Sequence, residues 1–166
     1  MLFRSSDAPP ADAAPTGPLL VQEQTRFATS GAQLTVTLTS APTNGNLLVM
    51  IGAANSGALT TVTGGGVASW ARATFAASNA NIEVWYGATD GTQSPISISR
   101  TGNGLAIWLS VTEWSGLAPS SALDKAAASS GTSTTASAGT ISTTTDRDLL
   151  LFAVADENAG MFGTPS

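Results

Sequence analysis

Residues 44–66 read NGNLLVMIGAANSGALTTVTGGG, and this stretch decides the fold. It opens with an Asn-Gly turn, a dipeptide that tolerates positive φ angles. Residues 47–53 follow and are apolar at both parities of a strand, a pattern typical of a strand covered on both faces. Three glycines at 64–66 then form a loop. The stretch therefore predicts a β-protein in which residues 47–53 are a central strand.

Residues 146–166, DRDLLLFAVADENAGMFGTPS, look like a second copy of this arrangement. A polar turn leads into an apolar strand at 148–155, and a Gly-containing loop follows. Two further strong strands, at 81–86 and 104–114, come after the first copy, whereas nothing comes after the second. We therefore expect the sandwich to lack its last strands or to borrow them from a neighbour, because an open edge beside an apolar strand is a template for pairing.

Strand-like segments separated by turns fill most of the remaining chain. Leu34, Val36 and Leu38 alternate with threonines, a period-two pattern with one apolar face. Turn residues recur at intervals of about 10 residues, as in all-β sandwiches and barrels. Only residues 122–129 have helical character, and they lack an apolar stripe. We expect an all-β, antiparallel β-sandwich with very little helix.

The first 18 residues differ from the rest of the chain. Residues 1–18 are rich in proline, alanine and aspartate, a composition that cannot bury enough apolar surface to fold alone. We interpret them as an extended N-terminal arm outside a sandwich domain of residues 19–166. Leu2 and Phe3 at its tip give a docking arm something to bury on a neighbouring subunit; the other interpretation is a disordered tail. The arm lacks the apolar stretch of a signal peptide.

The composition is poor in charge. Charged residues make up 10% of the chain and the net charge is −5, against a usual charged fraction of about 25%. No cluster of lysines and arginines exists to neutralise phosphates, so we expect neither nucleic-acid binding nor docking on anionic lipid. No run reaches the roughly 18 apolar residues of a membrane span. A surface covered by Ser, Thr, Asn and Gly is common in virion, secreted and cell-surface proteins.

The chain contains no cysteine and no histidine. These absences remove thiolate metal sites, the commonest general base and most zinc sites. We expect no cofactor and no metal. The glycines at 64–66 lack the lysine and following helix of a phosphate loop. The acidic residues Asp146, Asp148, Asp156 and Glu157 lack the spacing of an EF-hand loop, so we interpret them as solvated strand ends.

Five aromatic and acidic side chains on two expected strands are the candidate contact residues for a glycan or a neighbouring subunit: Glu83, Trp85, Trp108, Glu113 and Trp114. Indole faces stack on sugars, and carboxylates accept hydrogen bonds from sugar hydroxyls. The other interpretation is an aromatic cluster buried under a loop, a second sheet or a partner. The two glutamates could also form a glycosidase pair, which requires carboxyl groups about 5–10 Å apart across a cleft; we do not expect catalysis.

Four segments together resemble a jelly-roll, concanavalin-like β-sandwich family of bacteriophage structural proteins and bacterial surface proteins. They are TLTSAPTNGNLLVMIGA at 37–53, IEVWYGAT at 82–89, LSVTEWSGLAPSSALDKAAASSG at 109–131 and GTISTTTDRDLLLFAVA at 139–155. The resemblance covers residues 19–166 and implies a jelly-roll sandwich without established catalytic residues. Members of that family continue past this chain's last residues, which again implies missing or borrowed strands.

Two functions are consistent with these observations. The first is a non-catalytic virion structural protein, capsid-decorating or tail-associated, which assembles with other virion subunits or copies of itself through its arm and its open sheet edge. The alternative is a secreted or cell-surface carbohydrate-binding or adhesive module, polymerised by strand exchange. Neither function is enzymatic.

Overall fold

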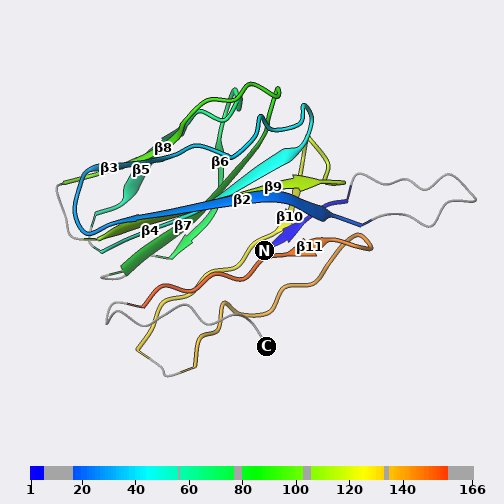
Figure 1. The fold of residues 1–166 in the computed structure, drawn as a ribbon. Helices are drawn as coiled ribbons and strands as arrows, with labels where there is room; N and C mark the ends of the chain where they lie inside the picture. The colour runs from blue at the N-terminus through cyan, green and yellow to red at the C-terminus, as the bar shows by residue number, and fades with distance from the viewer. Residues whose placement is uncertain (6–16, 56, 77–79, 103–105, 133–134, 157–166) are drawn as a thin grey trace, which may run out of the picture.

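The structure is a computed structural model that describes residues 1–5, 17–55, 57–76, 80–102, 106–132 and 135–156. Within these ranges the chain is all-β: it forms three antiparallel sheets and contains no helix, including none able to cross a membrane. Figure 1 shows the sheets as three layers, with the largest sheet in the middle. The prediction of an antiparallel, sandwich-like β-fold is therefore confirmed.

The middle layer is a five-stranded sheet. Its order is β2 (Leu19–Ala28), β9 (Ile107–Ser115), β4 (Leu47–Asn55), β7 (Ala80–Ala88) and β6 (Ala71–Ala76). β4 is the central strand, and its first four residues are buried although they point alternately to opposite faces. A strand apolar at both parities requires cover on both sides. The prediction of a doubly covered central strand is thus confirmed.

The second layer covers one face of this sheet, here called the inner face. It consists of β3 (Gln33–Val36), β8 (Ile96–Arg100) and β5 (Leu59–Thr63), in that order. Apolar side chains of both sheets interlock between the layers in the larger of two cores, whose fully buried members are Leu48, Met50, Ile96, Ile98, Ile107, Leu109 and Val111. This core is the two-sheet interior typical of a β-sandwich.

The third layer lies on the opposite, outer face. It is a small sheet of β10 (Leu123–Lys125), β1 (Leu2–Phe3) and β11 (Leu149–Leu150), with β1 in the centre (Figure 1). A second core lies beneath it, built around Phe3, Leu47, Val49, Val84 and Leu117. The outer face of the middle sheet is therefore partly covered by β1, β10 and β11.

The expectation that the N-terminal arm lies outside the sandwich is wrong for residues 1–5. Phe3 is completely buried and meets the Tyr86 ring edge-on, with ring centroids 5.2 Å apart. The Met1 amino group donates a hydrogen bond to the Leu151 carbonyl at 3.0 Å. Arg4 forms an ion pair with Asp124. Burial of the apolar residues Met1, Leu2 and Phe3 stabilises this docking. Residues 6–16 of the predicted arm lie outside the described part.

The expectation of a long strand at 148–155 is also wrong. Only Leu149–Leu150 is a strand, paired on one side with β1. Leu149 and Leu151 pack toward the second core, whereas Leu150 and Phe152 are 63% and 49% exposed. Within the described residues this segment has one neighbouring strand and cover on one face only, so it is not a second copy of β4. The rest of the half-repeat, 157–166, lies outside the described residues.

Candidate functional site

The sequence-predicted contact residues point to two different faces of the middle sheet. Side chains directly opposite each other on antiparallel strands share a face. The strand register places Glu83, Trp85 and Glu113 opposite the inward-pointing residues of β4, and Trp108 and Trp114 opposite its outward-pointing residues. The three tryptophans, each half-buried, therefore do not form one aromatic platform.

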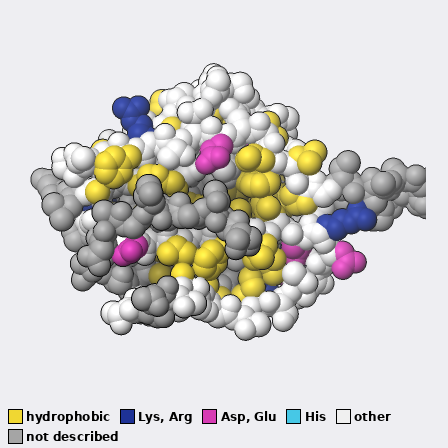
Figure 2. All heavy atoms as spheres, turned by 60° about the horizontal axis from the view of Figure 1, so that its bottom comes forward, with side chains coloured by type: hydrophobic (Ala, Val, Ile, Leu, Met, Phe, Trp, Pro, Cys, Tyr) yellow, Lys and Arg dark blue, Asp and Glu magenta, His cyan; other side chains and the backbone are white. Residues whose placement is uncertain are grey.

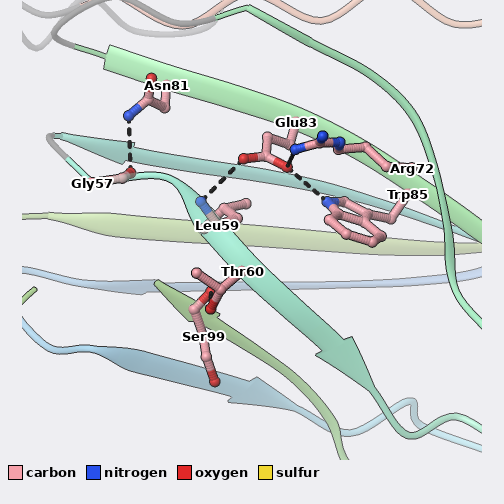
Figure 3. Close-up of polar contacts among 8 residues, drawn as sticks. All are labelled: Gly57, Leu59, Thr60, Arg72, Asn81, Glu83, Trp85 and Ser99. Carbon is pink, nitrogen blue, oxygen red and sulfur yellow. Dashed lines mark hydrogen bonds and ion pairs between the residues drawn. The ribbon is translucent and has the colours of Figure 1, made fainter. Parts of the chain in front are cut away.

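Glu83 is the centre of a buried polar cluster on the inner face (Figure 3). Its Oε1 accepts a hydrogen bond from the Leu59 backbone N–H at 3.0 Å. Its Oε2 accepts one from Trp85 Nε1 at 3.1 Å and pairs with the Arg72 guanidinium at 3.4 Å. Arg72 in turn lies over the rings of Phe75 and Trp85, 4.7 and 5.7 Å from their centroids. The buried charge is thus compensated by one cation and two neutral donors.

This cluster joins the two layers of the sandwich. Glu83 belongs to β7 of the middle sheet, whereas Leu59 belongs to β5 at the edge of the second sheet. Asn81, two residues earlier on β7, adds a hydrogen bond from its amide to the Gly57 carbonyl at 2.9 Å (Figure 3). The geometry is that of an inter-sheet clamp whose carboxylate is saturated, so it offers no free group for a substrate.

We predict that Glu83→Ala destabilises the fold far more than Arg72→Ala. The glutamate substitution leaves the buried Leu59 N–H and the Trp85 indole N–H without an acceptor, at a cost of about 2–4 kcal/mol. Arg72→Ala leaves both neutral donors on the carboxylate, and because Arg72 is 43% exposed its removal lets water reach the carboxylate, so we expect a smaller loss of about 1 kcal/mol. Urea unfolding of both variants checks this; equal losses would mean that the ion pair, rather than the two neutral donors, holds the clamp.

Glu113 forms a second buried hub, at the other end of the inner face. It is fully buried and accepts hydrogen bonds from the Thr43 backbone N–H at 2.8 Å and from the Asn46 and Gln22 amides at 2.6 Å each. Gln22 also bonds the backbone N–H and carbonyl of Ser40. Glu113 therefore anchors the connection between β3 and β4 onto strand β9 of the middle sheet.

The positions of Glu83 and Glu113 do not match a glycosidase pair. They lie opposite Gly52 and Leu48 of β4, four residues apart. Four residues of antiparallel strand span about 13 Å, before the separation of their two strands on either side of β4 is added. Such a distance exceeds that of both retaining and inverting enzymes. Both carboxylates are also occupied by protein donors, so the geometry assigns them structural roles.

The outer face carries the other two tryptophans beside exposed residues of β2. Trp108 lies opposite Phe27, and Trp114 lies opposite Leu20. Phe27 and Leu20 are 58% and 50% exposed. Between these two apolar ends Glu23 accepts a hydrogen bond from the Ser110 hydroxyl at 3.1 Å. Figure 2 looks toward this side of the molecule and shows separate patches of hydrophobic side chains.

β2 is not among the strands predicted from the sequence to carry contact residues. Its residues LLVQEQTRFA have apolar side chains at the two ends and polar ones between them. This order of residues is visible in the sequence, but it indicates a contact surface only when β2 is known to be an edge strand. In the described part of the chain β2 pairs with β9 alone. Its exposed apolar residues are Leu19, Leu20, Val21 and Phe27.

The triple-glycine loop is a turn, as predicted. Gly64, Gly65 and Gly66 all have positive φ, and a side chain at Gly64 would collide with the Pro95 carbonyl. The loop forms one wall of an open groove whose lining includes Asp90. Hydrogen bonds from Thr92 hold the pKa of Asp90 below its ordinary value. The described residues that line the groove include no cation, so they offer nothing to bind phosphate.

No group of three or more metal-ligating side chains comes together in the described ranges. Asp146, Asp148 and Asp156 therefore do not form a cation site among themselves; Glu157 lies outside those ranges. Comparisons with protein-family models, curated proteins and solved structures gave no match for this chain.

Proposed function

We propose that this chain is a non-catalytic structural protein of a virion, a capsid-decorating or tail-associated jelly roll that assembles with copies of itself or with other virion subunits. The observation that carries the proposal is the exposure of large apolar side chains along two sheet edges, β2 and β11. An open edge with exposed apolar residues is a template for pairing with another chain. Because residues 1–5 dock within their own chain, the edges rather than the arm are the assembly contacts.

The strand order supports a jelly roll. Eight strands, β2 to β9, build the two large sheets, in the orders β2-β9-β4-β7-β6 and β3-β8-β5. The chain changes sheet at every connection from β2 to β9 except that between β6 and β7. An eight-stranded double sheet of this kind is the architecture of viral capsid and lectin jelly rolls. The departure is β6, which lies beside β7 instead of extending the smaller sheet.

The state of the two buried carboxylates in the described residues supports a non-catalytic role. The two buried carboxylates are saturated by protein donors, and the sequence supplies neither histidine nor cysteine. A surface with few charges and exposed apolar edges suits permanent subunit contacts better than transient encounters with a charged substrate.

A carbohydrate-binding or adhesive module at the cell surface or outside the cell is the second candidate. Trp108 and Phe27 lie side by side on the outer face, with the Glu23 carboxylate and the Ser110 hydroxyl close by. Aromatic rings can stack on a sugar, and the polar groups beside them can accept hydrogen bonds from its hydroxyls. This surface replaces the predicted platform of Trp85, Trp108 and Trp114.

Labelling of particles tests the virion assignment, and a glycan array tests the alternative. We expect an antibody against the chain to decorate purified particles in immunogold electron microscopy, and the purified chain to bind no glycan. Unlabelled particles, together with glycan binding that Trp108→Ala abolishes and Trp85→Ala spares, would establish the surface-binding function instead. Trp85 is the matched control because it is half-buried on the opposite face.

A further inference from the structure

We infer that the free edge of β2 is a two-fold interface at which a second copy of this chain pairs antiparallel, joining two five-stranded sheets into one. The inference rests on the proposed assembly function: the partner is a second copy of this chain, and the contact is the β2 edge. β2 has ten residues, and within the described ranges its outer edge has no strand beside it. Alternate residues of an edge strand direct N–H and C=O groups outward, ready for another strand.

The residue order of β2 is self-complementary. Leu19, Leu20 and Val21 are at one end, Phe27 is near the other, and polar residues lie between them. Antiparallel pairing of two identical strands places the start of each beside the end of the other. Each exposed Phe27 then meets the exposed leucine and valine of the other copy, and this contact forms twice because of the symmetry.

The faces of the sheet restrict the register. A two-fold axis between antiparallel strands stands perpendicular to the sheet, so the outer faces of both copies lie on the same side of the joined sheet. Residues opposite each other must then share a face. The axis therefore passes beside a single central residue. An axis at Glu23 would set two carboxylates opposite each other, and one at Thr25 would set Glu23 opposite Phe27. An axis at Gln24 sets Glu23 opposite Thr25 and Gln22 opposite Arg26, with no like charges facing each other, and it places Phe27 beside the bulge at Val21.

A lysine on the edge tests the interface, because edge lysines block strand pairing. We expect Phe27→Lys to raise the dimer dissociation constant about a hundredfold, since each dimer carries the change twice. Thr61→Lys is the control, because Thr61 is exposed on β5, an edge strand of the second sheet. Sedimentation velocity over a concentration series measures both, and circular dichroism verifies that both variants fold.

A single cysteine tests the register, because the chain has no other. With the axis at Gln24 the two Gln24 Cα atoms would be about 4.5–5.5 Å apart, within the span of a disulfide. We expect Gln24→Cys to give a covalent dimer on mild oxidation, and Thr61→Cys, on the exposed surface of β5, to remain monomeric on a denaturing gel.

Two results would overturn the interface. A dimer that survives Phe27→Lys but dissociates with Phe152→Lys would place self-association at the β11 edge, so the assembly function would stand and the β2 pairing would fail. A wild-type chain that stays monomeric at every concentration, with no cross-link through Gln24→Cys, would also exclude the pairing. Particle labelling would then decide independently whether the chain is a virion component.

Discussion

Phe3→Ala should destabilise the protein by roughly 3–5 kcal/mol, the usual cost of removing a fully buried phenyl group. Phe3 has no exposed surface, contacts Tyr86 edge-on and lies in the second core with Leu47, Val49 and Leu117. Its removal leaves a cavity between the small outer sheet and the middle sheet. Because β1 is the central strand of the outer sheet, the loss should also loosen β10 and β11, and limited proteolysis should cut the segment 135–156 faster.

Leu150→Ala is the matched control for Phe3→Ala. Leu150 pairs with Leu2 in the same small sheet but is 63% exposed, so its truncation should change the free energy of unfolding by less than about 0.5 kcal/mol. Chemical denaturation of both variants measures the difference. Equal, small effects would show that β1 does not dock on its own sandwich in solution, and the original interpretation of a free arm would return.

The central strand β4 could be predicted from the sequence, whereas the structure around β1 and β11 could not, and the reason is physical. The segments 47–53 and 149–155 both contain no polar side chain. Periodicity reports how apolar a strand is, but not whether neighbours exist to cover it. β4 has a strand on each side and a layer on each face, whereas β11 has one strand beside it and exposes Leu150 and Phe152. The partners of Leu2, which are Lys125 and Leu150, are far along the chain and leave no local signal.

The prediction that Trp85, Trp108 and Trp114 share one surface was wrong for a related reason. A period of two separates the faces within one strand, but only the register between strands tells which faces coincide. Alternation within each strand puts Glu83 and Trp85 on one face of β7, and Trp108 and Trp114 on one face of β9. The pairing of both strands with β4 puts the first pair on the inner face and the second on the outer face. Likewise, β2 became a candidate interface only because the sheet order placed it at an edge.

Glu113 offers the sharpest test of the role of the buried glutamates on the inner face. Of Glu83 and Glu113, it is the one for which the described residues provide no ion pair. Glu113→Ala removes the acceptor of three hydrogen bonds, from Thr43, Asn46 and Gln22. The two side-chain amides can turn toward other partners, but the Thr43 backbone N–H cannot. The unpaired Thr43 donor costs about 1–3 kcal/mol, and the cavity left by truncating a fully buried side chain adds about 2 kcal/mol, so we expect a loss of about 3–5 kcal/mol in total.

Glu113→Gln separates the hydrogen bonds of this hub from its charge. The glutamine carbonyl can still accept from Thr43 and Asn46, while its amide faces the Gln22 amide, which must rotate to present its oxygen. Rotation breaks the bonds between Gln22 and Ser40, so we expect a loss of about 1–2 kcal/mol. Thermal and urea unfolding of the two variants should therefore rank wild type, glutamine and alanine in that order of stability. A glutamine variant as unstable as the alanine variant would mean that the negative charge itself holds the connection between β3 and β4, whereas an alanine variant as stable as wild type would show that this connection is held by packing alone.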